Sequence, residues 1–296
     1  MTRASAGERG FILVAVLWIL AALATLASVY SLYTGALAGA SHLSDDRLHA
    51  NASLQAGIEL AAYQLCVQPA TARPTSGAFE FALGDDKLAV AFRSEGARID
   101  LNAAPKPLLA GLFAGLGDGK EKSALYADRI IAWRKKGDVA GQNDEASAYK
   151  SAGYLYAPRQ APFPDVLELS LVRDLPADFV AQVSPFLTVF NGSAKIDPMT
   201  AAPEVLAALP GVTPAVLAAL LEQRARDPKN GPALLGLLGG AQVNASLEPR
   251  NAIRLSIEAK LAKLRTIHAD IVILITDGGD DPYRVLAWTD DFDAPI

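Results

Sequence analysis

The feature that most constrains this chain is an uncharged apolar segment close to its N-terminus. Residues 11–33 contain no charged side chain, and their few polar groups are hydroxyls. As an α-helix these 23 residues would extend about 35 Å, which exceeds the roughly 30 Å hydrocarbon core of a bilayer. The segment therefore predicts a helix that crosses a membrane once.

The flanks of this segment favour one orientation. Arg3 and Arg9 precede it, and basic residues are enriched on the cytoplasmic side of membrane helices. We therefore expect a cytoplasmic N-terminus, with everything after Tyr33 on the far side of the membrane. One alternative stays open. The stretch "GALAG" at 35–39 contains an Ala-x-Ala pattern that a signal peptidase could cut, although a secretory apolar core usually has only about 7–15 residues.

The helix is expected to continue beyond the membrane. Residues 34–66 contain no proline, and the next proline is Pro69, which ends the helix. Four apolar residues repeat at intervals of four, three and four positions, as on one face of a helix: Leu54, Ile58, Ala61 and Leu65. The sequence predicts one helix over 11–66, apolar in its first part and amphipathic in its second.

The chain after this helix contains an internal repeat. Two pairs of segments match: "RIDLNAAPKPLLAGL" at 98–112 with "KIDPMTAAPEVLAAL" at 195–209, and "RIIAWRKKGD" at 129–138 with "ALLEQRARDP" at 219–228. Each copy predicts a strand, a capped helix, a glycine-containing turn and a second helix that closes on arginine. Asn102 and Thr200 are the expected N-caps of the first helices.

Alternating apolar residues predict antiparallel strands on both sides of the repeat. Residues 88–92 form the first strand, "SEGA" at 94–97 is expected to turn the chain, and "ARIDL" at 97–101 to pair back as a hairpin. Three further strands are expected, at 252–261, 267–276 and 283–289. The sequence thus predicts an α+β fold in which the long helix packs on an antiparallel sheet.

Charge and motifs argue against a nucleic-acid partner. The formal net charge is −5, whereas nucleic-acid binders usually carry a basic surplus. The stretch "LPGVTPAVLAALLEQR" at 209–224 has the form of a helix-hairpin-helix, whose turn can offer backbone N–H groups to a phosphate. Thr213 stands at the second glycine position of that turn. We expect no nucleic acid, and a membrane-anchored helix-hairpin-helix DNA-binding protein is the alternative.

No catalytic constellation is visible in the sequence. It contains neither the Gly-x-Ser-x-Gly elbow nor the phosphate-binding loop motif. His268, Trp133 and Trp288 fall in predicted helices or strands and are interpreted as structural residues. We therefore expect a protein that is not an enzyme.

Two acidic loops raise the question of calcium, which takes about six to eight oxygen ligands. The first loop offers Asp138, Asp144 and Glu145, and the second offers Asp277, Asp280 and Asp281. Neither loop follows the EF-hand pattern, so hydrated turn residues are the favoured interpretation. No cofactor is predicted, and calcium stays open.

These segments together resemble a known family. A charged leader that ends in Gly10, followed by Phe11 and an apolar helix, is similar to the prepilins of the type IV pilin-like superfamily. The remainder resembles the minor pseudopilin K family of bacterial type II secretion. The matching segments are "RGF" at 9–11, "RIDLNAAP" at 98–105, "IIAWR" at 130–134, "APFPDVLEL" at 161–169, "LTVFNGSAKID" at 187–197, "AAPEVLAALPGV" at 201–212 and "VLAW" at 285–288.

The resemblance implies a processed membrane subunit. A prepilin peptidase would cut between Gly10 and Phe11 and methylate the new amino group of Phe11. The subunit would lie in the inner membrane with its C-terminal domain in the periplasm. It would cap the pseudopilus tip together with minor pseudopilins I and J, and serve the export of folded proteins across the outer membrane. It would carry two SAM-like, helix-hairpin-helix-type modules inserted in a pilin-like β-domain.

Two positions depart from the family pattern. Some members bind calcium in an acidic loop after the Trp-Arg motif, but here Lys135 and Lys136 follow Arg134. Most pilin-like subunits carry glutamate at the fifth mature position, thought to pair with the terminal amine of a neighbour, and here that position is Ala15. A carboxylate in the bilayer costs about 2–3 kcal/mol. Because a tip subunit has no neighbour above it, Ala15 fits a tip position.

The resemblance and the patterns together predict a division of the chain into seven parts. They are a leader (1–10), the N-terminal helix (11–66), the first part of the β-domain (67–102), a first helical module (103–185), connecting strands (186–198), a second helical module (199–249) and the C-terminal strands (250–296).

Overall fold

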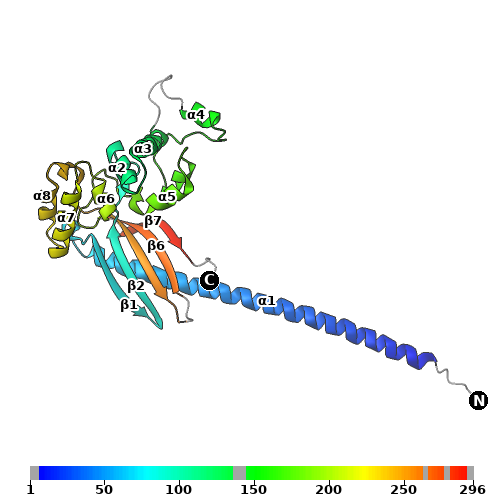
Figure 1. Cartoon of the computed structure of the whole chain (residues 1–296). Helices are drawn as coiled ribbons and strands as arrows, with labels where there is room; N and C mark the ends of the chain where they lie inside the picture. Colours follow the sequence, from blue (N-terminus) through cyan, green and yellow to red (C-terminus); the bar gives the residue numbers. More distant parts are fainter. Residues whose placement is uncertain (1–6, 136–144, 263–265, 277–280, 292–296) are drawn as a thin grey trace, which may run out of the picture. The chain divides into compact units, whose positions relative to one another are not determined.

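The computed structural model describes residues 7–135, 145–262, 266–276 and 281–291, with side chains described over 13–33 and from residue 46 onward within these ranges. The chain divides into two compact units, Met1–Gln55 and Ala56–Ile296. The fold is α+β, as the sequence predicts, with an apolar N-terminal helix, an antiparallel sheet and a helical segment (Figure 1).

The N-terminal helix, α1, runs over Gly7–Cys66 and so ends where the sequence predicts. Within it, Leu13–Tyr33 is long and apolar enough to cross a membrane. Its large side chains, such as Trp18 and Leu26, are exposed rather than packed in a core. That combination is expected of a helix whose solvent is lipid.

The C-terminal end of α1 packs on the sheet. Ile58, Ala61 and Leu65 are buried, as the apolar stripe predicts. A Cβ at Gly57 would lie 3.1 Å from the Cδ1 of Ile257 and 3.5 Å from the Cγ2 of Val90. The helix therefore approaches the sheet closely at this glycine.

The sheet has five antiparallel strands in the order β1-β2-β5-β6-β7. Their bounds are Ser76–Leu83, Asp86–Ser94, Ala252–Lys260, Thr266–Ile275 and Tyr283–Asp290. In β2 and β5 the buried residues alternate with more exposed ones, because one face of the sheet meets the core and the other is open.

The first hairpin differs from the prediction. β2 pairs with β1, which precedes it, and not with 97–101. The residues Glu95–Ala97 form a 3₁₀ helix, η2. Ser94 is its N-cap, and the Ser94 side chain accepts a hydrogen bond from the Gly96 N–H. The chain then enters β3 (Ile99–Asp100), which pairs in parallel with β4 (Leu187–Thr188).

A long helical segment connects β2 to β5, although these two strands are neighbours in the sheet. Its α-helices are α2 (Lys106–Gly115), α3 (Lys120–Arg134), α4 (Glu145–Ser151), α5 (Ala177–Val183), α6 (Pro203–Ala207), α7 (Pro214–Arg226) and α8 (Gly231–Leu238). Its short 3₁₀ helices include η3 (Val166–Leu171), η4 (Ser184–Phe186) and η5 (Gly239–Asn244), whereas η1 (Ala70–Ala72) lies between α1 and β1. The segment is therefore an insertion within the sheet.

The two copies of the repeat share one hydrophobic core. Leu112 and Ile130 of the first copy and Leu206 and Leu220 of the second belong to the same cluster of buried residues. Neither copy forms a core of its own. The division into modules at 103–185 and 199–249 therefore remains a prediction from the sequence repeat.

The predicted N-caps Asn102 and Thr200 are wrong. The cap positions are Pro105 for α2 and Ala202 for α6. Ala202 is extended, as expected of a residue before proline, so the helix cannot begin earlier. Asn102 instead bonds both backbone groups of Phe163, at 2.7 and 2.9 Å.

Candidate functional site

The repeat places a buried aspartate at the corresponding position of each copy, at the end of β3 in the first and after the isolated β-bridge of Ile196 in the second. Asp100 accepts a hydrogen bond from the Asn102 N–H at 2.7 Å, and Asp197 accepts one from the Met199 N–H at 2.9 Å. Asp100 also accepts from the Gly192 N–H at 2.7 Å. The Ile-Asp pairs seen in the sequence therefore build the same turn in front of α2 and α6.

The arginine that closes each copy completes this motif. Arg134, at the end of α3, donates to the carbonyls of Leu101 and Ala104. Arg224, in α7, donates to the carbonyl of Ala201 at 2.7 Å. Burial lowers the pKa of both guanidiniums. Each arginine thus ties the second helix of its copy to the loop that leads into the first helix.

A buried carboxylate joins the insertion to the sheet. Glu95, in η2, is fully buried and accepts a hydrogen bond from Arg254 Nε of β5 at 2.8 Å. Thr188 of β4 donates its hydroxyl to the other carboxylate oxygen. Glu95 therefore contacts the sheet and the short β3–β4 pair at the point where the insertion leaves the sheet.

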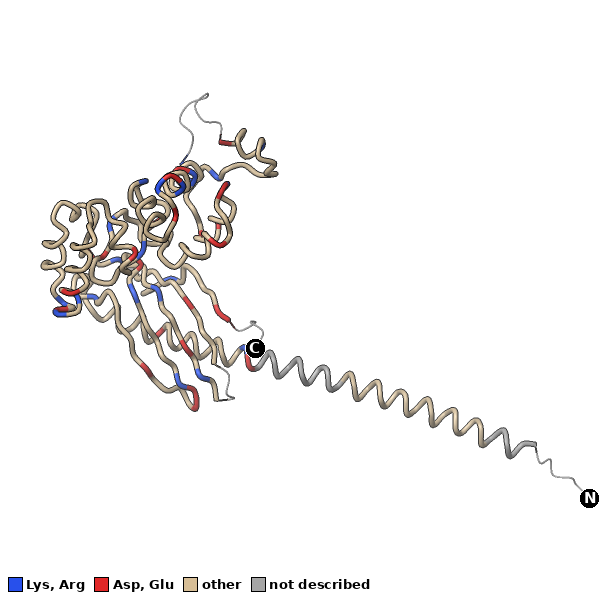
Figure 2. The backbone as a smooth tube through the Cα atoms, in the orientation of Figure 1, with Lys and Arg blue, Asp and Glu red and all other residues tan. Residues whose placement is uncertain are grey.

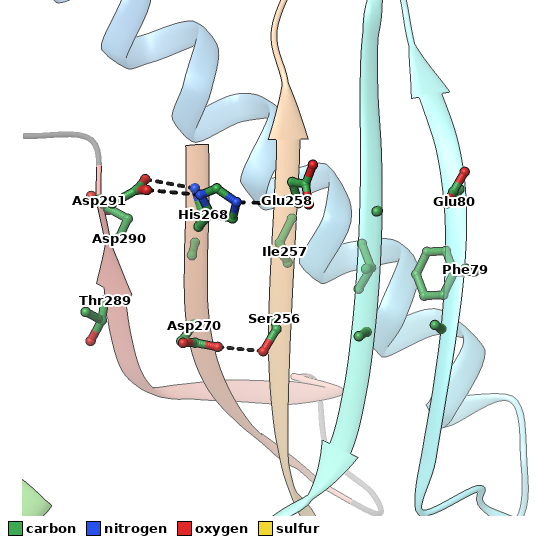
Figure 3. A pocket seen from close by; sticks show the side chains of 15 residues that line it. Phe79, Glu80, Ser256, Ile257, Glu258, His268, Asp270, Thr289, Asp290 and Asp291 are labelled. Atoms are coloured by element: carbon green, nitrogen blue, oxygen red, sulfur yellow. Dashed lines mark hydrogen bonds and ion pairs between the residues drawn. The ribbon is translucent and has the colours of Figure 1, made fainter. Parts of the chain in front are cut away.

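The open face of the sheet carries a groove of about 640 Å³ that crosses all five strands. Figure 3 shows His268 of β6 between Asp291 and Glu258. Its Nδ1 lies 3.1 Å from Asp291 Oδ2 and its Nε2 lies 4.0 Å from Glu258 Oε2. The His268 N–H lowers the pKa of Asp291, and the hydrogen bond from Lys260 lowers that of Glu258.

Of the three residues interpreted as structural, His268 and Trp288 are exposed and Trp133 is buried. The His268 side chain is 62% exposed, because the alternation of β6 places it on the open face opposite Ile267 and Ala269. Trp288 is 37% exposed on the edge strand β7. Trp133 is buried as expected, and its indole N–H donates to Glu168 at 2.9 Å. The alternation of exposed and buried residues in β6 is the signal that could have placed His268 on the open face.

The calcium candidates fall mostly outside the described residues, namely Asp138, Asp144, Asp277 and Asp280. Glu145 is described, and it forms ion pairs with Arg129 at 2.8 Å and with Arg173 at 3.5 Å. Across the residues that the structure describes, no group of three metal-ligating side chains comes together. Glu145 therefore has two guanidinium groups as its neighbours.

The residues predicted to take part in processing and assembly lie at the start of α1. The backbone of Gly10 and Phe11 is helical, and their side chains lie outside the described set. Ala15 is partly buried within its own helix. The family resemblance indicates these positions from the sequence. It indicates neither Glu95 nor the groove on the sheet, because the residues that form them come together only after folding.

Residues 89–192 match the family model described as type II secretion system (T2SS), protein K. In fold, the chain is similar to a chain of a crystal structure titled the GspK-GspI-GspJ complex from the enterotoxigenic Escherichia coli type 2 secretion system. The alignment covers 82% of this chain and 99% of that chain, at 18% identity and a TM-score of 0.57. No curated protein matches the sequence.

The matched domain lies in a chain that also has an apolar N-terminal helix and a five-stranded antiparallel sheet. Residues 89–192 thus carry a domain of the type II secretion protein K family, and the fold is similar to that of a chain in the GspK-GspI-GspJ complex. The match begins inside β2 and extends through β4, so it spans the first helical module and the turn that carries Glu95.

Proposed function

We propose that this chain caps the tip of the pseudopilus and serves the export of folded periplasmic proteins across the outer membrane. The observation that carries the proposal is the long helical insertion between the adjacent strands β2 and β5, within a domain of the protein K family. A bulky insertion is compatible with a terminal position, where no further subunit has to pack. Ala15, which supplies no carboxylate for a neighbour above, supports the same position.

The proposed partners are the minor pseudopilins I and J. The similar crystal structure is a complex of GspK with GspI and GspJ. We propose that this chain forms the corresponding complex, anchored in the inner membrane by Leu13–Tyr33. Arg3 and Arg9 support a cytoplasmic N-terminus, which leaves the residues after the membrane segment in the periplasm.

The proposed role is assembly and not catalysis or DNA binding. In the helix-hairpin-helix of the second copy, the Thr213 side chain accepts a hydrogen bond from the Val216 N–H at 3.3 Å. One of the donors that such a hairpin would offer to a phosphate is thereby engaged. The net charge of −5 also opposes DNA.

Mass spectrometry of the mature N-terminus tests the processing step. In cells that contain a prepilin peptidase, we expect the chain to begin with N-methylated Phe11, because cleavage follows Gly10. Cells without the peptidase are the control and should retain the full leader. A mature chain that begins within 35–39 would identify a conventional secretory signal and overturn the proposal.

Copurification tests the partners separately from the processing. The full-length chain in detergent is expected to retain pseudopilins I and J through size-exclusion chromatography. A mobility-shift assay with duplex DNA at low salt is the counter-test. DNA binding together with no retention of I and J would favour the anchored DNA-binding alternative.

A further inference from the structure

Basic side chains gather at the end of the sheet that adjoins the helical insertion. Figure 2 shows Lys and Arg positions, in blue, concentrated in this part of the trace. Arg93 of β2 and Arg254 of β5 lie directly opposite each other on adjacent antiparallel strands. Like charges in this arrangement destabilise a sheet, because directly opposed side chains are only about 5 Å apart at their Cβ atoms.

A third guanidinium joins this pair. Arg98, which follows η2, interacts electrostatically with both Arg254 and Arg93. Burial, and then the charge of Arg254, lowers the pKa of Arg98. Arg224 of the second helical module also acts electrostatically on Arg93. Two strands of the sheet, the segment that follows η2 and helix α7 thus each bring one arginine to this region.

The carboxylates nearby do not neutralise this charge. Glu95 pairs with Arg254 and also acts electrostatically on Arg98, so one carboxylate serves two guanidiniums. Asp270 acts on Arg98 from β6 but contacts no guanidinium in the described part of the chain, and it accepts a hydrogen bond from Ser256 at 2.6 Å. Over the same residues, Arg93 and Arg98 form neither an ion pair nor a side-chain hydrogen bond. Positive charge therefore stays in excess.

Arg93, Arg98 and Arg254 line a cavity of about 450 Å³. This cavity adjoins the groove on the open face of the sheet, and Ser256 lines both. The polar lining also includes the hydroxyl groups of Ser76, Ser94 and Ser256 and one acidic residue, Glu95, which is paired with Arg254. Planar guanidiniums bind oxyanions through two parallel N–H donors, and hydroxyls add further donors. The volume falls within the range of small-molecule sites and exceeds what a bare oxyanion needs.

We propose that this cavity, at the junction of the sheet and the insertion, binds a phosphate group through Arg93, Arg98 and Arg254. Two sources share that chemistry, free phosphate and the phosphorylated head group of a lipid. A bound phosphate would lower the mutual repulsion of the arginines and so stabilise the junction that Glu95 holds.

The test is calorimetric titration of the full-length protein in detergent at low ionic strength. We expect inorganic phosphate to bind, and Arg93→Gln to weaken it at least about tenfold, because that variant removes a guanidinium with no other partner. Arg93 is exposed, so the variant should keep the near-UV circular dichroism of the wild type. Arg98→Gln is the second variant, and the same loss is expected.

Arg284→Gln is the matched control, because Arg284 is an exposed arginine of the same sheet, on β7, and does not line the cavity. Its phosphate affinity should stay within twofold of the wild type. Water-soluble dihexanoyl phosphatidate distinguishes the sources: tighter binding than phosphate points to a lipid head group, and equal binding to free phosphate. No phosphate binding, an equal loss in Arg284→Gln, or acetate that binds as tightly as phosphate would each overturn the proposal.

Discussion

At the scale of single residues, the fold depends on charged groups held at the edges of the insertion. Glu95 is the clearest case, because its carboxylate is fully buried and contacts Arg254 of the sheet and Thr188 of the β3–β4 pair. Burying a charge is costly unless it is paired and hydrogen-bonded. Glu95 meets that condition only in the folded chain, so it couples the insertion to the sheet.

Glu95→Gln should therefore lower the free energy of unfolding by about 2–3 kcal/mol, because it leaves Arg254 without its partner in a partly buried site. The measurement is chemical denaturation of the detergent-solubilised protein, followed by near-UV circular dichroism. Glu222→Gln is the control, since the Glu222–Arg226 pair has side chains 70% and 68% exposed and should contribute less than about 0.5 kcal/mol. Wild-type stability in Glu95→Gln would remove the coupling role.

At the scale of elements, the two copies of the repeat are packed directly against each other. Gly111 of α2 faces the residue that follows α6, and a Cβ at Gly111 would lie 2.6 Å from the carbonyl oxygen of Ala208. Real Cβ atoms do not approach backbone this closely. The contact between the copies therefore needs a glycine inside a helix, where glycine is otherwise unfavourable.

Gly111→Ala should destabilise the protein by about 1–3 kcal/mol, because overpacking outweighs the gain in helix propensity. Gly115→Ala makes the same change in the same helix, at a position with no other atom within 4 Å of the added Cβ, and should be neutral or slightly stabilising. Thermal unfolding of the two variants compares these effects. A Gly111→Ala variant at least as stable as Gly115→Ala would show that the copies are not in tight contact.

Prediction from sequence succeeds here where a pattern is local. The length of α1, the strands β5 to β7 and the duplicated segments follow from periodicity and self-similarity. It fails where pairing is decided at long range. The strand β1 was missed because its residues are exposed or only partly buried, so no alternation marks them. β3 was paired wrongly because its partner β4 lies almost ninety residues further on.

The same limit applies to the candidate sites. Gly10, Phe11 and Ala15 could be named from one contiguous motif. The cavity at the junction could not, because Arg93 and Arg254 become neighbours only when β2 pairs with β5 across the whole insertion. Adjacent strands joined through so long a segment leave no local signal of their pairing.

At the scale of the whole molecule, the insertion and the anchor are compatible with an asymmetric subunit. β2 and β5 stay neighbours while the chain between them builds a second layer of helices. Such a segment can become longer without disturbing the sheet, because its two ends are connected to the paired strands β2 and β5. In the proposed tip position, the membrane helix has no neighbouring subunit above it. Ala15 suits that position because it supplies no carboxylate that would need such a neighbour.

The last prediction concerns that position. Ala15→Glu would place a carboxylate inside the bilayer, where an unpaired charge costs about 2–3 kcal/mol. In a tip subunit no neighbour above supplies an amine, so we expect the variant to be recovered with pseudopilins I and J several-fold less than the wild type, at equal amounts in the membrane. Ala15→Gln is the control, because it has the same size without the charge and should assemble at a level closer to the wild type. Quantitative immunoblotting of copurified complexes measures both variants. Recovery of Ala15→Glu at the wild-type level would mean that position 15 does not distinguish a tip subunit from a shaft subunit, and the assignment would then rest on the insertion alone.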